Sequence, residues 1–278
     1  MSSCDGVSLS ILVARTDVSF LRRTIPHIVK SSAYPFKERA LVVDTAPLSP
    51  EYASRPHVGS RQELDEICNG LVADGWVDRL HYIDYARTEI DRIYSTYFRQ
   101  RLRETHDFRG YPIYGSLWPL EVAPTDHVVH FDSDMLLHQD QGRSWIDEAV
   151  DVLKRRADII FVAPLSGPPR SDGKLFQGST AYEADADGFN KFKFFTSRKY
   201  LVDRRKLRSM GLKPRWISKK RRLASLWTGV SALWSFEMMA SDQLERLGLW
   251  RADLSDPRTW TLHTPDHGPE FLRRLPVM

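Results

Sequence analysis

Two aspartates one residue apart, Asp132 and Asp134, directly follow an apolar, β-prone run over 128–131. Ligands of open parallel sheets bind beyond the carboxyl ends of the strands, and this pair is expected at such an end. The alternation of side chains along an extended chain would point both carboxylates the same way. Neighbouring carboxylates suit the hard cations Mg²⁺ and Mn²⁺, which usually keep water and substrate phosphates as further ligands. The pair therefore predicts a metal site that neutralises charge on a phosphate or a diphosphate leaving group.

The spacing of the two aspartates is not diagnostic by itself, because the chain contains a second such pair, Asp185 and Asp187. No apolar run precedes the second pair, and glycine and polar residues surround it, so we expect it in a surface loop. An ordinary turn at the end of a strand is the alternative interpretation of Asp132 and Asp134.

A histidine near the end of the chain is a further candidate ligand. His263 ends a short β-prone run over 260–263, and His267 follows it. Pro265 argues against a helix through both histidines, so we expect them in a loop, where one could supply an imidazole ligand. A lone histidine is more often a surface or core residue than a metal ligand. The two aspartates are the reason to consider that one of these histidines binds a metal.

The elements that must position these residues alternate along the first half of the chain. Strands are expected at 7–14, 38–45, 77–82, 128–131 and 157–164. Helices are expected at 20–31, 61–74, 89–103 and 144–156, the last with Ser144 as its N-cap. Beyond Pro164 the pattern weakens, leaving a strand at 194–202 and a helix at 235–247 capped by Ser235. This order predicts one α/β domain with a mainly parallel sheet covered on both faces and a looser second half.

The composition is that of a folded protein with an ample core. Of the 278 residues 42% are hydrophobic, and eight are tryptophan. The two cysteines have no metal-binding spacing, which suits a reducing cytoplasm. The N-terminal segment lacks the basic region of a signal peptide, and no window is apolar enough to span a membrane. We therefore expect a cytoplasmic protein, at most peripheral at the inner face of the membrane.

The net charge of +4 is unevenly distributed. The run 198–222 carries twelve cationic residues and one aspartate. A solvated face or a mobile loop is one interpretation of this run. The others are contact with an anionic substrate, an anionic membrane surface or nucleic acid, and composition does not choose among them.

Four segments together resemble the GT-A fold glycosyltransferases, especially the bacterial family 2-like enzymes: HFDSDM at 130–135, ALVVD at 40–44, SFEMMASDQLERLG at 235–248 and WTLHTPDHG at 260–268. The resemblance implies a single Rossmann-like GT-A domain over 1–278, with a nucleotide-sugar-binding half (1–140) and an acceptor-binding half (141–278). It also implies a hexosyltransferase that uses Mn²⁺ or Mg²⁺ and a UDP- or GDP-sugar. The acceptor would be a glycan, a lipid-linked molecule or a small molecule, and no nucleic-acid partner is expected.

The resemblance assigns roles residue by residue. Asp134 would bind the metal directly, and His263 would complete the metal shell beside the diphosphate. Asp132 would hold the donor ribose or assist the metal through water, and Asp44 would meet the nucleotide base. The other positions expected to line the nucleotide pocket are Ala14, Arg15, Thr16 and Ser133.

The chain departs from the family pattern in two places. Asp44 is followed by Thr45-Ala46-Pro47 instead of the usual acidic, glycine and serine residues. IDRIYSTYF at 90–98 replaces the usual asparagine and glycine stretch, and offers Arg92 as a diphosphate contact. These departures concern the base and diphosphate contacts and leave the metal assignment intact.

Inverting sugar transfer needs a general base, and the candidates are Glu237 and Asp242 in the helix at 235–247. Glu237 falls in the first turn, where exposed N–H groups keep a carboxylate ionised, although acidic residues are also favoured there for helix stability alone. Asp242 is the second candidate, and on a regular helix the two cannot face one pocket. Trp227 and Trp234, just upstream, either stack on a sugar ring or pack in the core.

Two other classes of function stay open. A nucleotidyltransferase or other metal-dependent phosphoryl-transfer enzyme also needs paired carboxylates at a strand end, but the chain lacks a G-x-x-x-x-G-K-[ST] phosphate loop. A nucleic-acid-binding protein would use the basic run 198–222, where Tyr200 and Trp216 are the interleaved aromatic residues.

Overall fold

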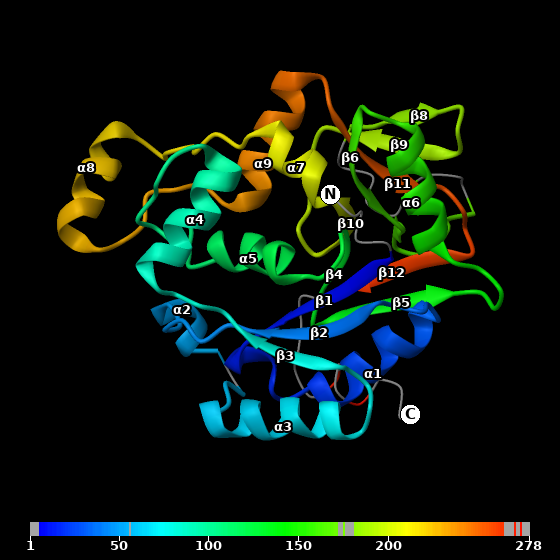
Figure 1. Cartoon of the computed structure of the whole chain (residues 1–278), viewed down its shortest axis with the longest axis horizontal. Coiled ribbons are helices and arrows are strands. Elements are labelled where there is room, and N and C mark those ends of the chain that lie inside the picture. Colours follow the sequence, from blue (N-terminus) through cyan, green and yellow to red (C-terminus); the bar gives the residue numbers. More distant parts are fainter. Residues whose placement is uncertain are drawn as a thin grey trace.

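The computed structural model describes residues 6–55, 57–171, 175, 181–263, 270 and 273. Within these residues nine strands form one central sheet, flanked by helices (Figure 1). In spatial order the strands are β3 (Arg79–Tyr82), β2 (Glu38–Val43), β1 (Val7–Val13), β4 (His127–Asp132), β10 (Lys199–Asp203), β6 (Ile159–Ala163), β11 (Trp250–Leu254), β9 (Phe189–Phe192) and β8 (Glu183–Asp185). The sheet therefore takes strands from both halves of the chain.

Strand direction differs between the two parts of this sheet. β1 is parallel to both of its neighbours, β2 and β4, and β2 is parallel to β3. β10 enters between β4 and β6 in the opposite direction, and β9 is antiparallel to β8 and β11. β6 and β11 are parallel to each other. The expected parallel sheet is thus found in β1 to β4, whereas the remainder is mixed.

A second, three-stranded sheet among the described residues places a late strand beside the turn that follows β4. Its strands are β5 (Met135–Gln139), β12 (Thr259–His263) and β7 (Leu165–Ser166). β12 runs antiparallel to β5, with His263 opposite Met135. His263 is therefore the last residue of a strand and not a loop residue as expected, and this register sets it beside Asp134. His267 lies outside the described residues.

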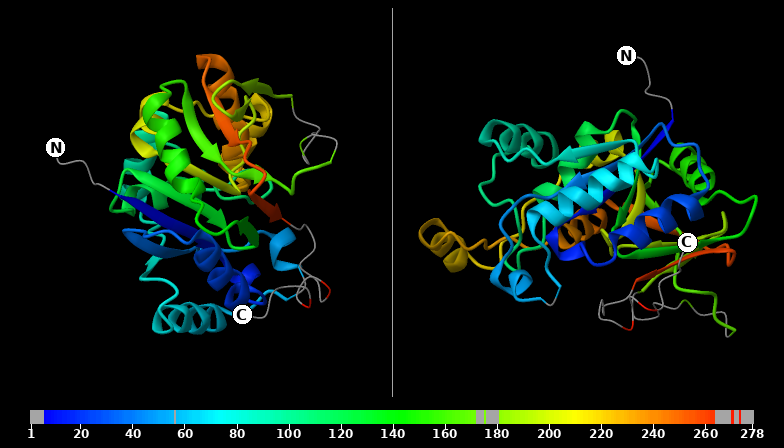
Figure 2. Two further views of the ribbon diagram at one scale, coloured as in Figure 1. Left: turned by 90° about the vertical axis from the view of Figure 1, so that its right-hand side faces the viewer. Right: turned by 90° about the horizontal axis from the view of Figure 1, so that it is seen from below.

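Helices cover both faces of the central sheet (Figures 1 and 2). One face carries α1 (Leu21–Ser32), α3 (Arg61–Ala73) and α6 (Trp145–Arg155). The other carries α4 (Arg87–Phe98), α5 (Tyr114–Val122), α7 (Arg204–Met210) and α9 (Phe236–Leu247). Because both faces are covered, neighbouring residues of a strand are buried on opposite sides, which explains the continuous apolar runs in the sequence.

Several helix ends follow from local signals. The Oγ of Ser144 accepts a hydrogen bond from the third residue of α6 (3.1 Å), and Ser235 caps α9 in the same way (3.4 Å). Both caps confirm the prediction. α4, in contrast, ends at Phe98 and not at Arg103, because Arg99 adopts a left-handed φ of 58°.

Elements without a sequence-based expectation include α5, β5, the 3₁₀ turn η1 (Arg15–Asp17), α2 (Pro50–Ala53) and α8 (Lys219–Thr228). The strand expected at 194–202 begins only at Lys199. Of the second aspartate pair, Asp185 ends β8 and Asp187 lies in the turn before β9. Both bind the guanidinium of Arg156, at 3.1 and 3.0 Å. None of the helices in the described part of the chain combines the length and apolar character needed to cross a bilayer.

Candidate functional site

A cavity of about 550 Å³ lies at the carboxyl ends of β1, β2 and β4, and we refer to it as the strand-end pocket. β1 lies between β2 and β4, so the order of strands reverses here and the loops that follow them diverge. Leu12 pairs with Asp132, and the amide of Asp44 donates to the carbonyl of Val13 (2.9 Å), which aligns the three strand ends. The pocket is lined by Leu12, Val13, Ala14, Thr16, Asp17, Ser19, Asp44, Ala46, Pro47, Leu48, Ser49, Tyr52, Arg55, His57, His106, Gly110, Pro112, Asp132, Ser133 and Asp134.

The structure brings together most of the predicted residues of the first half. The predicted residues that line the pocket are Ala14, Thr16, Asp44, Asp132, Ser133 and Asp134. They lie at the ends of β1, β2 and β4 or directly after them, so the pocket brings together residues that are far apart in the sequence. Arg15 is not among them, because its exposed guanidinium turns away to the carbonyl of Gly59 (2.8 Å).

The two aspartates of the motif make different contacts. β4 ends at Asp132, and Ser133 and Asp134 form a turn before β5, so the chain does not stay extended through the pair as expected. The Oδ1 of Asp132 lies 3.2 Å from the Nε2 of the buried His130, two residues earlier on the same strand. The Oδ2 of Asp134 lies 3.2 Å from the Nε2 of His263.

His263 is held between a cation and an anion. Its Nδ1 lies 2.5 Å from a guanidinium nitrogen of Arg198. Because a guanidinium only donates, Nδ1 accepts this bond, and the ring proton is on Nε2, directed to Asp134. The carbonyl of Arg198 also accepts a hydrogen bond from the amide of Asp132 (2.7 Å), so Arg198 joins the strand end to the histidine.

The Asp134–His263 pair fits part of a divalent metal site. Neighbouring ligands of an octahedral ion with bonds of about 2.1 Å are about 3 Å apart, close to the 3.2 Å between Asp134 Oδ2 and His263 Nε2. Among the described residues no three His, Cys, Asp or Glu side chains gather around one point. A metal at this pair would therefore need water or substrate oxygens as its other ligands.

Asp17 is a third carboxylate at this end of the pocket that sequence reasoning missed. It accepts hydrogen bonds from Ser133 Oγ and from the amide of Ala14, both at 2.9 Å. Burial raises the pKa of Asp17 to about 6, and the charge of Asp134 adds to this effect. The sequence signal that could have identified Asp17 is its position shortly after β1, next to the predicted segment 14–16.

Asp44, which follows β2, also lines the pocket and is surrounded by polar groups. The Oδ1 of Asp44 accepts hydrogen bonds from the amide of Ala46 (2.8 Å) and the hydroxyl of Tyr85 (2.7 Å), and the Nε2 of His106 is 3.9 Å from Oδ2. Burial lowers the pKa of His106, whereas burial and the charge of Asp44 raise the pKa of Tyr85. Both rings are therefore neutral near pH 7. Tyr85 and His106 were not predicted, because neither belongs to a recognisable motif.

Arg92 and Asp242 are engaged elsewhere. The guanidinium of Arg92 binds Glu89 (2.6 Å) and approaches Glu121 (3.7 Å), so it does not line the strand-end pocket. Asp242 binds Arg215 (2.9 Å) on the partly exposed side of α9. Neither Arg92 nor Asp242 therefore lines the strand-end pocket.

Glu237 does not line the strand-end pocket, but it binds the segment 196–198, which contacts the Asp132–Asp134 motif. Its Oε1 accepts hydrogen bonds from the amide of Ser197 (2.7 Å) and from the hydroxyls of Thr196 and Ser197 (both 3.2 Å). The next residue, Arg198, binds both His263 and the backbone of Asp132. The segment 196–198 thus connects Glu237 to the motif, whereas Asp242 faces away, as the helix period requires.

Neither upstream tryptophan lines the pocket. Trp234 packs edge-on against Phe108, with ring centroids 5.4 Å apart, and lies under the guanidinium of Arg215. Trp227, in α8, is 91% exposed. Trp227 therefore does not pack in the core, which was one of its two expected roles.

No family model matches the chain, and no curated protein matches it. Among solved structures, the fold is similar to that of S. aureus TarS, a glycosyltransferase, with a TM-score of 0.51 and 11% sequence identity. The match covers 94% of this chain and 37% of the TarS chain, so the chain spans little more than a third of that protein. This likeness shows a glycosyltransferase-like fold.

Proposed function

We propose that the chain is a metal-dependent glycosyltransferase that moves a sugar from a nucleoside-diphosphate sugar to an acceptor. The observation that carries this proposal is the strand-end pocket, in which Asp44 and the Asp132–Asp134 motif meet in one cavity of about 550 Å³. That volume is in the range of small-molecule sites. The glycosyltransferase-like fold supports the same function.

The donor is a UDP- or GDP-sugar whose nucleotide lies along the pocket. Asp44, with Tyr85 and His106 around it, offers both acceptors and donors for a base edge. Asp132 holds the ribose, and Ala14 and Thr16 border the same space.

Asp134 and His263 would hold Mn²⁺ or Mg²⁺, with Asp132 assisting through water. When bound there, the cation would neutralise charge on the departing nucleoside diphosphate. Outer partners of metal-binding histidines usually accept the proton of the second ring nitrogen, so the guanidinium of Arg198, which donates to Nδ1 in the metal-free protein, would have to move when a metal binds Nε2. Asp17 adds negative charge nearby, which favours a cation at this end of the pocket.

Glu237 is the general base in this proposal, in an inverting transfer by a hexosyltransferase. Its carboxylate is fixed by segment 196–198, which also contacts the motif. Asp242 has no such connection, because Arg215 binds it. The acceptor is a glycan, a lipid-linked molecule or a small molecule bound mainly by residues 141–278.

A panel of nucleotide sugars with Mn²⁺ tests the proposed function. We expect release of UDP or GDP from one sugar donor, loss of that release with a chelator, and its loss in Asp134→Asn. The matched control is Asp187→Asn, which changes the same residue type in the second Asp-x-Asp pair and should retain turnover. Pyrophosphate release from a nucleoside triphosphate, with no turnover of any nucleotide sugar, would instead identify a nucleotidyltransferase.

A further inference from the structure

Helix α8 (Lys219–Thr228) stands out from the body of the molecule at its edge (Figure 1, and the right-hand view of Figure 2). Ser218 caps its start, because its Oγ accepts a hydrogen bond from the amide of Arg221 (3.1 Å), and Gly229 ends it with a φ of 69°. None of its residues is buried. A helix of ten residues is marginal in water without packing on another surface, so α8 has an unmet packing requirement.

The outward face of α8 is apolar. Leu223 and Trp227 are four residues apart and therefore lie on one side of the helix, with Leu226 next to them. Their exposed fractions are 64%, 91% and 56%. Ser225, which approaches Glu104 of the body (3.5 Å), marks the opposite, inward side.

Cations lie at the start of the same face. Lys219 precedes Leu223 by four residues and Lys220 precedes it by three, so both extend the apolar stripe toward the N-terminus of α8. Arg221 and Arg222 follow, and the sequence contains no acidic residue between Asp203 and Glu237. The surface is therefore both apolar and strongly cationic.

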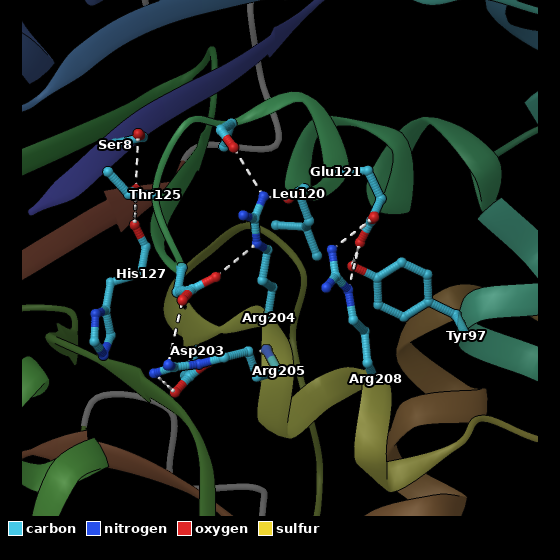
Figure 3. Close-up of polar contacts among 12 residues, drawn as sticks. Ser8, Tyr97, Leu120, Glu121, Thr125, His127, Asp203, Arg204, Arg205 and Arg208 are labelled. Carbon is cyan, nitrogen blue, oxygen red and sulfur yellow. Dashed lines mark hydrogen bonds and ion pairs between the residues drawn. The ribbon is translucent and has the colours of Figure 1, made fainter. Parts of the chain in front are cut away.

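The cations of the basic run before α8, other than the exposed Lys213, contact groups within the protein. Each arginine of α7 binds a carboxylate: Arg204 binds Asp126 (3.1 Å), and Figure 3 shows Arg205 with Asp203 (2.8 Å) and Arg208 with Glu121 (2.7 Å). Lys206 donates to the carbonyls of Leu153, Arg156 and Ile159. Of the run 198–222, the structure thus leaves mainly Lys213 and the cations of α8 available to an anionic partner.

We propose that α8 docks the protein on an anionic lipid surface. Leu223, Leu226 and Trp227 enter the interface, while Lys219 and Lys220 contact the headgroups. Apolar and aromatic side chains flanked by cations are the composition of helices that lie in a membrane interface. An anionic leaflet attracts cations near its surface, and tryptophan prefers the headgroup level. Nucleic acid would match the lysines but leave the three apolar side chains in water.

A membrane surface fits the shape of α8 better than a groove on a partner protein does. A single helix that projects beyond the body reaches a flat surface before any other element does (Figure 1). The proposal does not depend on the proposed enzymatic function, because it uses no residue of the strand-end pocket.

Vesicle flotation of the full chain tests the docking surface. We expect the protein to float with vesicles of phosphatidylcholine and phosphatidylglycerol, and much less with phosphatidylcholine alone. Added salt should weaken the binding. Lys219→Glu with Lys220→Glu should lower the partition coefficient by roughly tenfold or more. Trp227→Ser should also lower it, while the remaining binding keeps its salt dependence.

Arg22→Glu with Arg23→Glu is the matched control. These two cations are also adjacent and exposed and lie in the first turn of a helix, α1. A first-turn glutamate suits the helix dipole at both sites, so neither double variant should unfold its helix. Near-UV circular dichroism of each variant checks that the fold is retained. The control should float as the unchanged protein does.

Three results would overturn the proposal. The first is no flotation with either vesicle. The second is an equal loss in the α1 control, which would mean that overall charge and not α8 drives binding. The third is a dimer by light scattering that Trp227→Ser dissociates, without vesicle binding, which would make a second copy of the chain the occupant of this face.

Discussion

At the scale of single residues, the contact between Asp134 and His263 carries the metal assignment. In the metal-free protein the ring proton of His263 lies on Nε2, facing Asp134, while Nδ1 accepts a hydrogen bond from Arg198. A metal bound at Nε2 would require this proton to move to Nδ1, so the guanidinium of Arg198 would have to leave Nδ1, because both groups would then be donors.

His263→Gln is expected to keep the fold and to weaken Mn²⁺ binding by roughly one to two orders of magnitude, because one of two protein ligands is lost. Titration calorimetry with Mn²⁺ in the presence of UDP or GDP measures this change. His138→Gln is a suitable control, since His138 is half-exposed and pairs with Asp140 instead. Unchanged Mn²⁺ affinity in His263→Gln would remove His263 from the site.

Glu237→Gln is expected to retain donor binding and lose sugar transfer. The amide oxygen can still accept the hydrogen bond from Ser197, so the segment 196–198 should stay in place. The side chain can no longer take a proton from an acceptor hydroxyl. A nucleotide-induced thermal shift checks binding, and product formation checks transfer. If transfer persists, Asp242→Asn becomes the next variant to measure.

Lys199 makes the stability of the protein depend on pH. It is 3% exposed, and burial lowers its pKa to about 7. Because the unfolded chain keeps its proton up to its ordinary pKa, the unfolded state binds more protons above about pH 7. The free energy of unfolding should therefore rise with pH from about 7 toward the unfolded pKa, by roughly 1.4 kcal/mol for each unit of pKa shift.

Lys199→Met should remove that pH dependence. The variant should be more stable than the natural chain below about pH 7, where folding otherwise buries a charge, by on the order of a few kcal/mol. Urea unfolding at a series of pH values measures both slopes. Parallel slopes for the two proteins would contradict the assignment of this dependence to Lys199.

At the scale of elements, Arg204 and Arg205 offer a matched comparison at the start of α7. Arg204 donates to the carbonyls of Leu120 and Ala123 at the end of α5 and to Asp126 before β4 (Figure 3). Arg205 binds Asp203 and Asp126 but is 53% exposed, against 12% for Arg204. The first residue joins three elements, and the second is a surface ion pair.

Arg204→Lys should lower the free energy of unfolding by roughly 2 kcal/mol, because an ammonium group cannot make the forked set of contacts. Arg205→Lys should cost less than about 1 kcal/mol, as is usual for exposed pairs. Urea denaturation of both variants tests the difference. Equal costs would show that charge alone, and not the geometry of the guanidinium, holds α7 to α5.

At the scale of the whole molecule, the central sheet makes the two halves of the chain interdependent. β4 pairs with β10 as well as with β1, and β5 pairs with β12, so the strands on either side of the motif both need a partner from the second half. Both hydrophobic cores also contain residues from beyond position 140, such as Trp145 in one and Phe161 in the other. The proposed functional halves are thus not separate folding units.

A fragment of residues 1–140 is therefore expected to lack cooperative unfolding, whereas the full chain should unfold in one transition. Near-UV circular dichroism and thermal melts of both proteins measure this. A fragment that melts cooperatively and binds UDP or GDP would contradict the expectation and would place the complete nucleotide site in the first half.

The sequence by itself determined the elements whose signals are local. β1, β2, β4 and β6 are apolar runs long enough to be recognised, and the caps at Ser144 and Ser235 depend only on the next few residues. α5 escaped recognition because it is buried on most sides and so lacks a polar face. The left-handed turn at Arg99 was not predicted, because no glycine stands at this position.

Tertiary structure alone decided which distant residues meet. The turn at Ser133 separates the two aspartates, and the register of β12 against β5 brings His263 to Asp134. Parallel pairing of β1 with β2 and β4 joins Ala14, Asp44 and Asp132 at one pocket. Such contacts depend on strand order and register, which arise from packing between segments far apart in the chain, and no local pattern of residues encodes them.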